Sequence, residues 1–347
     1  MKLLRYGPVG QEKPGLLDAE GTLRDLSGLI DDITPRRLAP EALAALAAVD
    51  PARLPAVPGN PRLGVPWNGT PKYVAIGLNY HDHAVESNMP VPVEPVIFPK
   101  WTSCLCGAND DIIHPPESTQ LDWEVELGIV IGSRARKVSE AEALDHVAGY
   151  VLANDVSARD WQLQRSGGQW GKGKGFDTFG PVGPWLVTKD EVPDPQKLDL
   201  WLDVNGQRKQ TGTTSLMIFS CAQVVAYLSR IMTLEPGDLV ITGTPPGVGM
   251  GQNPKVFLKG GEVVRLGIEG LGERARAFKN VVTQRFCRKA GVALSSLSCF
   301  TDARMIASKA STSSDARKSN WVRSGWPAAV TFWAWASPSS IQVSTDA

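Results

Sequence analysis

The sequence has no long apolar segment and few cysteines. No run approaches the roughly 18 apolar residues that a membrane-spanning helix needs, and the stretch Met1–Pro8 lacks the apolar core of a secretory signal. The 347 residues include five cysteines, and no CxxC pair is among them, so neither a disulfide framework nor a structural zinc site is indicated. These absences predict a soluble cytoplasmic protein with no membrane partner.

An excess of charge of either sign is also missing. Lys plus Arg and Asp plus Glu number 36 each. A neutral chain lacks the broad electrostatic attraction that nucleic acids exploit, so we expect no nucleic-acid partner. Glycine (34) and proline (26) are plentiful instead, and this composition favours many short strands and tight turns over a helical bundle.

Composition divides the chain into three parts. Residues 1–65 contain a predicted strand–turn–strand at 10–26, a predicted helix at 40–47 and a proline-rich linker. Residues 66–282 alternate short apolar strands with glycine turns. Residues 283–347 are rich in serine and carry clustered tryptophans without a sustained period. This last pattern favours a poorly ordered tail, and a partner-binding tail is the alternative.

The segment Asp122–Gly132 places two glutamates in an apolar strand pattern. With a period of two, the apolar side chains at alternate positions from Val125 share one face, and Glu124 and Glu126 share the other, about 6–7 Å apart. Two like charges so close in an apolar strand are costly unless a cation or protons neutralise them. The alternative is a solvated edge strand that carries two ordinary glutamates.

A third carboxylate follows a second apolar strand. Val147–Ala153 predicts a buried strand that ends at Asn154 and Asp155, and Ser157–Asp160 is typical of a capping box that starts a helix. Asp155 is then expected at a strand-to-helix turn, where functional groups are common; an ordinary turn or capping residue is the alternative. Glu124, Glu126 and Asp155 together form an all-oxygen set that suits Mg²⁺ or Mn²⁺ better than Zn²⁺.

These separated motifs resemble the fumarylacetoacetate hydrolase family from about Tyr73 to Val281. The Glu-x-Glu strand, followed by an aspartate just before Ser-Ala-Arg-Asp, corresponds to the family's metal ligands and so to Glu124, Glu126 and Asp155. The resemblance implies a β-rich α+β fold, a roll of mixed β-sheets with a small N-terminal domain. It also implies a homodimer that depends on Mg²⁺ or Mn²⁺.

The segment Gly77–Glu86 resembles the family's lid, in which a His-x-x-Glu pair activates water. The pair maps onto His83 and Glu86. Residues i and i+3 share a face of a short helix, so the glutamate can orient and charge-compensate an imidazole that acts as general base. An incidental surface pair is the alternative, and His81, two residues earlier, is expected to point elsewhere.

The remaining site residues are also carried over from the resemblance. Gly171–Asp177 resembles the loop with the active-site lysine, which we place at Lys174, with Lys172 one register away. The segment Leu239–Gly249 contains a Thr-Gly-Thr-Pro signature, and its prolines leave no helix start for a dinucleotide pyrophosphate. The predicted substrate-binding residues are Asn79, Lys100, Gln162 and Thr244.

The resemblance implies hydrolysis of a carbon–carbon bond in a small 2,4-dioxo acid, which gives pyruvate and a second acid. The opening Lys2–Leu17 resembles a branch associated with 2,4-dioxo-3-deoxy sugar acids, whose members are often labelled ureidoglycolate lyases. Ureidoglycolate lysis, and isomerisation or decarboxylation of 2-hydroxyhepta-2,4-diene-1,7-dioate, are the alternative reactions. A ligand-binding protein without catalysis is a further alternative, with little to favour it.

Overall fold

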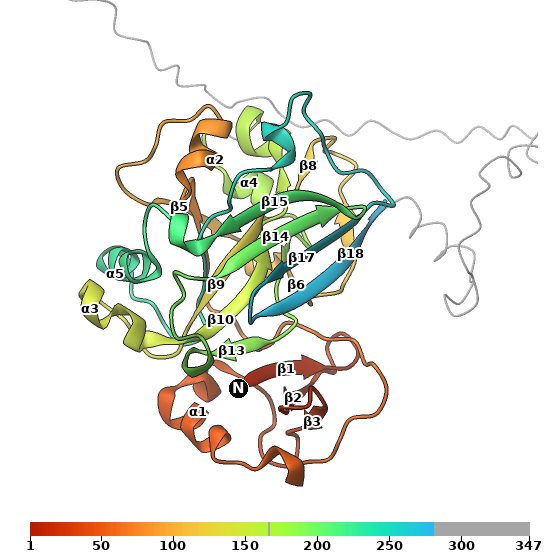
Figure 1. Cartoon of the computed structure of the whole chain (residues 1–347), viewed down its shortest axis with the longest axis vertical. Coiled ribbons are helices and arrows are strands. Elements are labelled where there is room, and N and C mark those ends of the chain that lie inside the picture. Colours follow the sequence, from red (N-terminus) through yellow and green to blue (C-terminus); the bar gives the residue numbers. More distant parts are fainter. Residues whose placement is uncertain (166, 281–347) are drawn as a thin grey trace, which may run out of the picture. The chain divides into compact units, whose positions relative to one another are not determined.

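The computed structural model describes residues 1–165 and 167–280. A large mixed sheet, drawn from red to green in Figure 1, runs through the protein in the strand order β3-β2-β1-β13-β10-β9-β16-β4-β5. In that order the strands are β3 (Leu23–Asp25), β2 (Lys13–Leu17), β1 (Lys2–Tyr6), β13 (Leu186–Thr188), β10 (Val147–Asn154), β9 (Val125–Ile131), β16 (Leu239–Ile241), β4 (Tyr73–Gly77) and β5 (Val96–Lys100).

A second sheet has the order β15-β14-β17-β18-β7. Its strands β14 and β17 contact β9, so it packs against the centre of the large sheet. Two short pairs, β11 with β8 and β12 with β6, complete the strands. The bounds are β15 (Gln207–Thr213), β14 (Asp199–Val204), β17 (Val263–Ile268), β18 (Gly272–Asn280), β7 (Ile112–His114), β11 (Ser157–Ala158), β8 (Leu121–Asp122), β12 (Gly180–Pro181) and β6 (Leu105–Cys106).

The helices are short, and the largest, α5, begins with a capping box at Ser220. The α-helices are α1 (Pro40–Ala47), α2 (His81–Glu86), α3 (Glu140–Ala143), α4 (Gly171–Lys174) and α5 (Cys221–Ile231), and Asp160–Gln164 forms a π-helix. Turns of 3₁₀-helix cover Pro35–Leu38, Pro51–Arg53, Thr102–Cys104, Leu144–His146, Lys189–Glu191, Thr214–Leu216 and Gly249–Gly251. Within the part of the chain that the structure describes, no helix is long and apolar enough to cross a bilayer. The strand-rich α+β fold predicted from the sequence is confirmed.

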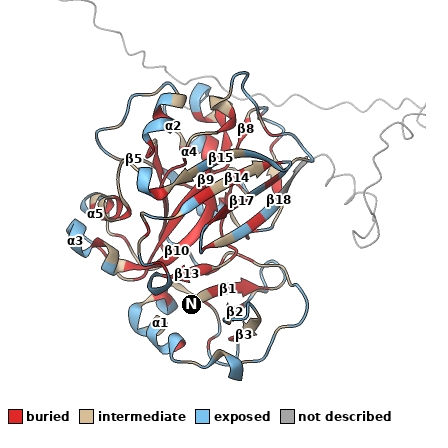
Figure 2. Ribbon diagram, viewed as in Figure 1, coloured by how far each residue is buried: buried red, intermediate tan, exposed pale blue. Residues whose placement is uncertain are grey.

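Strands β9 and β10 form the centre of the core, where every residue of both strands is buried (Figure 2). Strand β9 lies between β10 and β16 in the sheet, and both of its faces are covered, which explains its almost continuous apolar sequence. Gly128 is needed here because a Cβ would lie 2.7 Å from Cγ1 of Val151 on β10. The solvated edge strand considered for Glu124 and Glu126 is therefore wrong.

The N-terminal residues continue the large sheet. The predicted strand–turn–strand is present as β2 and β3, and the predicted helix is α1 with the same bounds. Strand β1 pairs with β13, which lies beyond residue 65, at Lys2↔Val187 and Leu3↔Leu186. The division at residues 65 and 282 stays a prediction, and the tail 283–347 lies outside the described residues.

The capping box predicted at Ser157–Asp160 is wrong. Ser157 and Ala158 form strand β11 and pair with Asp122 and Leu121. The Ser157 hydroxyl donates to the carbonyl of Asp155 at 2.9 Å. The helix that follows starts later, at Asp160, and it is a π-helix, a form often found at functional sites.

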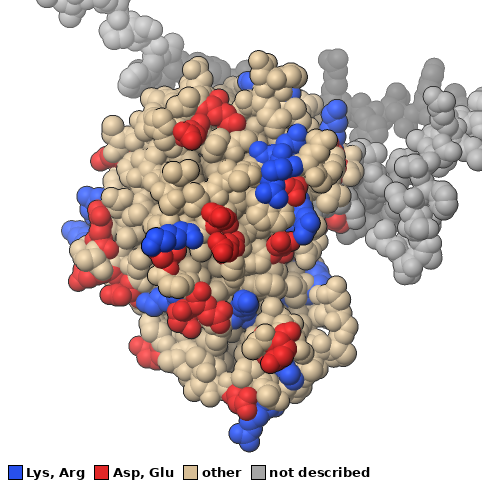
Figure 3. Space-filling model, in the orientation of Figure 1, with Lys and Arg blue, Asp and Glu red and all other residues tan. Residues whose placement is uncertain are grey.

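Charged side chains of both signs lie side by side on the face shown in Figure 3. On the second sheet, for example, Arg265 pairs with Glu273 at 2.5 Å, and Arg208 pairs with Asp203. Exposed pairs of this kind contribute little to stability. The charges that bear on function are buried.

Candidate active site

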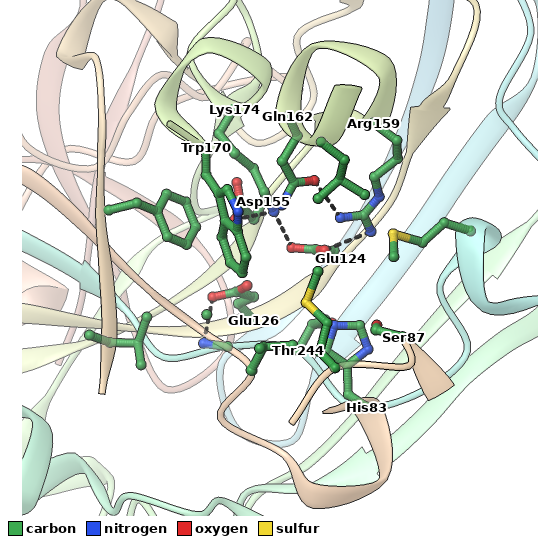
Figure 4. Close-up of a pocket in the computed structure, with 18 residues that line it drawn as sticks. His83, Ser87, Glu124, Glu126, Asp155, Arg159, Gln162, Trp170, Lys174 and Thr244 are labelled. Atoms are coloured by element: carbon green, nitrogen blue, oxygen red, sulfur yellow. Dashed lines mark hydrogen bonds and ion pairs between the residues drawn. The ribbon is translucent and has the colours of Figure 1, made fainter. Parts of the chain in front are cut away.

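A cleft with an empty volume of about 380 Å³ opens beside the start of β9 and the end of β10 (Figure 4). Acidic and basic side chains line one wall, and apolar side chains line much of the rest. Of the sequence-predicted site residues, those lining the cleft are His83, Glu124, Glu126, Asp155, Gln162, Lys174 and Thr244.

The antiparallel register of β9 and β10 brings the three carboxylates together. Ala153 pairs with Glu126, and the amide of Asp155 donates to the carbonyl of Glu124 at 2.9 Å. The start of one strand therefore lies beside the end of the other. One oxygen from each of Glu124, Glu126 and Asp155 lies within 4.8 Å of the others, and all three residues are buried. The clustering predicted from the sequence is present.

Three buried cations contact this carboxylate cluster. Lys174 Nζ donates to Glu124 Oε2 at 2.6 Å and to Asp155 Oδ2 at 2.7 Å. Lys100 Nζ donates to Asp155 Oδ1 at 2.6 Å and to the carbonyls of Lys174 and Phe179. Arg159 Nη2 lies 2.7 Å from Glu124 Oε1. Two carboxylates are thus each held by two cations.

Glu126 is different, because no Lys or Arg among the described residues forms an ion pair with it. Its Oε2 accepts the amide N–H of Gly243 at 2.7 Å. Burial, reinforced by the charges of Asp155 and Glu124, raises its pKa well above the ordinary value. For Glu124, burial acts in the same direction, but the charges of Lys174 and Arg159 outweigh it and lower the pKa to about 2.

The carboxylate cluster fits an oxygen-preferring divalent cation. Three buried oxygen donors converge, and the raised pKa of Glu126 marks negative charge that the neighbouring lysines and arginine leave incompletely neutralised. Glu124, Glu126 and Asp155 would hold such an ion. Magnesium and manganese both suit this donor set, and the geometry does not choose between them.

The predicted His–Glu pair lies on α2 at the other side of the cleft. His83 Nδ1 is 3.2 Å from Glu86 Oε2, and Glu86 Oε1 accepts the amide N–H of Gly247 at 2.9 Å. His83 is buried, whereas His81 is exposed and contacts Asp82. With Nδ1–H donating to the glutamate, Nε2 is the nitrogen left to accept a proton.

One glycine explains how the lysine segment reaches the carboxylates. In Gly171–Lys174, now seen as helix α4 and not a loop, a Cβ on Gly173 would lie 2.4 Å from the amide nitrogen of Gln162. The backbone of α4 therefore packs directly on the π-helix, and this close approach buries Lys174. Lys172 points outward and donates to the carbonyl of Arg165.

The four predicted substrate-binding residues differ in position. Gln162 and Thr244 line the cleft. Asn79 and Lys100 are not among its lining residues. The Asn79 amide donates to the carbonyls of Thr242 and Phe219 and accepts from the Phe219 amide, so it holds backbone in place. Their contacts with a substrate stay predictions.

Asp122 was not among the predicted site residues, yet it is fully buried and accepts four hydrogen bonds. Oδ1 accepts the amides of Trp123 and Gly249 at 2.8 and 2.6 Å; Oδ2 accepts the amide of Met250 at 3.0 Å and Nε of Arg159 at 2.8 Å. Asp122 thereby connects the arginine on Glu124 to the turn that follows Gly247, the residue that binds Glu86. Its place at the head of the Asp-Trp-Glu-x-Glu stretch was the only signal.

Gln210 is a second residue that was not predicted, and no motif in the sequence marks it. It is fully buried, and its side chain bonds the Thr244 hydroxyl at 2.8 Å, the Pro245 carbonyl at 2.7 Å and the Val125 amide at 3.0 Å. The Thr244 hydroxyl in turn donates to the carbonyl of Val125 at 2.9 Å. Gln210 therefore fixes the Thr-Gly-Thr-Pro loop against β9.

Residues 72–279 match the family model described as fumarylacetoacetate (FAA) hydrolase, C-terminal. The chain belongs to the fumarylacetoacetate hydrolase family. A Burkholderia ambifaria relative described as a "putative hydrolase" is 62% identical over 281 residues, which are 81% of this chain and 99% of the relative.

Solved structures of family members agree with the fold. Maleylpyruvate hydrolase from Sphingobium sp. SYK-6, in complex with manganese(II) ion and pyruvate, superimposes with a TM-score of 0.67 at 28% identity. The 2-hydroxyhepta-2,4-diene-1,7-dioate isomerase from Mycobacterium marinum gives 0.61 at 34% identity. Each comparison covers 81% of this chain and 99% of the neighbour.

Proposed function

We propose that this family member is a Mg²⁺- or Mn²⁺-dependent hydrolase that cleaves a small 2,4-dioxo acid to pyruvate and a second acid. One observation carries the proposal: a buried Glu–Glu–Asp cluster lines the same cleft as His83, which contacts Glu86. The first suits a 2-oxo acid held by a cation, and the second suits activation of water. The manganese and pyruvate in the Sphingobium enzyme support this choice of substrate.

The substrate's carboxylate and 2-oxo group are expected at the carboxylate cluster. A divalent cation held there by Glu124, Glu126 and Asp155 would supply Lewis-acid polarisation to a bound 2-oxo acid. Lys174, between Glu124 and Asp155, stabilises negative charge that develops on the 2-oxo oxygen. Gln162 and Thr244 border the same space and position the acid.

His83 is the general base in this proposal. Glu86 accepts a hydrogen bond from Nδ1–H, so Nε2 takes a proton from water and the imidazole becomes an imidazolium. The hydroxide oxygen bonds to C4, the distal carbonyl carbon. The C3–C4 bond then breaks, and its electron pair passes to C3 to give the enolate of pyruvate. The imidazolium returns its proton to C3, so the products are pyruvate and the acid derived from C4.

A second candidate is isomerisation of a 2-hydroxydienoate diacid, which the Mycobacterium marinum neighbour's name supports, and decarboxylation of such a diacid is a related alternative. These reactions need proton transfer but no attack by water, and they release no pyruvate. Ureidoglycolate lysis has no comparable support from the neighbours, and its product is glyoxylate. The products therefore distinguish the three reactions.

The test is an assay of the purified protein against acylpyruvates, a 2,4-dioxo-3-deoxy sugar acid, ureidoglycolate and the hydroxydienoate diacid. Each substrate is assayed first in the presence of EDTA and then after Mg²⁺ or Mn²⁺ is added in excess. We expect metal-dependent pyruvate release, and a loss of about 10²–10⁴-fold in kcat in His83→Ala. His81→Ala is the matched control, because His81 lies on the same helix and is exposed. Pyruvate release that persists in His83→Ala would contradict the assignment.

We also propose that the protein works in the cytoplasm as a homodimer. The few cysteines, without a CxxC pair, and the family's usual assembly support these two statements. Sedimentation at equilibrium measures the assembly directly, and a monomer at micromolar concentration would contradict the second statement.

A further inference from the structure

Part of the apolar lining of the cleft, here called the apolar wall, lies on the side of the predicted base. Met89 follows α2, and its amide donates to the carbonyl of Ala84 at 3.0 Å. Met250 comes directly before Gly251, where a Cβ would lie 2.3 Å from Cδ of Glu86. Both methionines line the cleft, so they flank the space next to the His83–Glu86 pair. Figure 4 shows His83 beside Ser87 at this end, apart from Asp155 and Lys174.

Leu163 is an apolar residue that lines the same cleft from the π-helix, and we count it in the apolar wall. It lines the cleft next to Gln162 and is 39% exposed, so it lies at the mouth. A substrate whose C4 faces His83 would direct the group beyond C4 toward this leucine and the two methionines. Methionine fits ligands of varied shape because it is unbranched and flexible.

The cations of the cleft already face two carboxylates each. Lys174 contacts Glu124 and Asp155, and Arg159 contacts Asp122 and Glu124. Two further basic residues near the mouth, Arg165 and Lys172, lie over the Trp161 ring, at 3.8 and 6.0 Å from its centroid. Neither of them lines the cleft. A second carboxylate on the substrate would therefore lose water without gaining a cation of its own.

One uncharged polar group remains on this side. The Ser87 hydroxyl lines the cleft and is buried, with no hydrogen-bond partner among the described residues. A single hydroxyl can serve one neutral oxygen, such as the C4 carbonyl. It does not replace the paired donors that a carboxylate needs.

We infer that the group beyond C4 is short, uncharged and apolar, and that Met89, Leu163 and Met250 select it. The inference rests on the proposed function and deepens it: the substrates are alkyl acylpyruvates, in preference to dioxo diacids or hydroxylated sugar acids. Burial of apolar surface then raises kcat/KM by up to about fourfold for each added methylene until the wall is filled.

The test compares acids that differ only in the terminal group. With Mg²⁺ present, kcat/KM for 2,4-dioxoheptanoate should exceed that for 2,4-dioxoheptanedioate at least tenfold. A parallel calorimetric titration uses the uncleavable pair 2-oxoheptanoate and 2-oxoheptanedioate. The monoacid, 2-oxoheptanoate, should have the lower Kd. Equal or better use of the diacid overturns the inference. If no substrate turns over, the proposed function fails, and the titration alone decides the inference.

Two variants test the assigned residues. Leu163→Arg and Met89→Lys each place a cation in the wall and should raise the diacid-to-monoacid ratio at least tenfold. Val93→Arg is the matched control, since Val93 is 94% exposed and does not line the cleft. Leu163 is partly exposed, so its variant is expected to fold even if the one at Met89 does not. An unchanged ratio in a folded Leu163→Arg variant overturns the assignment.

Discussion

Two groups of ion pairs in this protein use the same residue types in different ways. The arginine cluster (Arg5, Glu12, Asp32, Arg62 and Asp110) joins the N-terminal strands to the loop before β7. Arg62 contacts Asp110 at 2.5 Å and Glu12 at 2.8 Å, and Arg5 contacts Asp32 at 2.7 Å. Every carboxylate in it has an arginine. In the carboxylate cluster, Glu126 has none.

The pKa values show what this difference means. Burial opposes ionisation of Glu12, but the hydrogen bond from Arg62 and the charges of Arg5 and Arg62 outweigh burial. The pKa of Glu12 is therefore lowered. The pKa of Glu126 is raised by burial and by two carboxylate neighbours. A buried ion pair is therefore no sign of function by itself, whereas a buried carboxylate without a cation is one.

The largest effect is expected from removing that unpaired charge. Glu126→Gln should lower kcat/KM about 1000-fold, because loss of a ligand weakens a Lewis-acid effect of several kcal/mol. Its melting temperature without metal should stay the same or rise, since an uncompensated buried charge is gone. Activity assays with Mg²⁺ and thermal melts in EDTA measure both. A variant that keeps wild-type turnover would remove Glu126 from the proposed metal site.

The arginine cluster should behave in the opposite way. Arg62→Met leaves Asp110 and Glu12 without their closest cation and should lower the free energy of unfolding by about 2 kcal/mol, less than for a fully buried pair because the cluster is partly exposed. The kcat of the folded variant should not change. Urea unfolding and steady-state assays at a temperature where the variant is folded test this. A fall in kcat would mean that the arginine cluster also supports the cleft.

Asp122 connects the two sides of the cleft, and we expect an intermediate effect on activity. Asp122→Asn keeps the shape of the side chain but turns one of its two oxygens into an NH₂ donor. That NH₂ group would face either Arg159 Nε or a backbone N–H, which are themselves donors. We expect kcat to fall about tenfold, as for residues that orient ligands, with a shifted pH–rate profile because Glu86 loses support. A change in KM alone, with an unaltered profile, would assign Asp122 a purely structural role.

The smallest expected effect is on the pH dependence of stability, which should have opposite signs for the carboxylate cluster and the arginine cluster. The folded pKa of Glu126 lies above its ordinary value of 4.5, so the folded state binds its proton more tightly. In EDTA, wild type should gain stability relative to Glu126→Gln as the pH falls through the folded value toward 4.5. The slope cannot exceed about 1.4 kcal/mol per pH unit.

Glu12 should show the reverse dependence. Its folded pKa is below 4.5, so wild type should be more stable than Glu12→Gln above pH 4.5 and lose that advantage as the pH falls through the folded value. Urea unfolding of the three proteins, wild type and the two variants, across the pH range tests both signs. The stability difference between wild type and variant should change with pH in opposite directions for Glu126 and Glu12. The same direction of change in both would contradict the contrast between the two clusters.

Local patterns were sufficient for much of the site. The alternation around Glu126 predicted a buried strand, and the strand ending at Asp155 needed only the antiparallel register to bring the carboxylates together. The i, i+3 spacing predicted the contact of His83 with Glu86. These features depend on residues that are close together in the chain, and the spacing of such residues can be read directly from the sequence.

Features that depend on distant backbone could not be predicted in this way. Asp122 bonds amides that lie 127 and 128 positions later in the chain, and a backbone amide has no sequence signature. The capping box at Ser157 failed because tertiary pairing with β8 outcompeted the local motif. Asn79 lies among backbone groups of two other segments, which the lid resemblance did not reveal.

The two walls of the cleft rest on different kinds of structure. Glu126 belongs to the fully buried β9, where a changed side chain disturbs the packing of the whole sheet. Leu163 and Met250 lie on a π-helix and a 3₁₀ turn near the surface, and replacements there are absorbed locally. After gene duplication, a copy can therefore drift toward a new acyl group by a few substitutions in the apolar wall while its reaction is inherited intact.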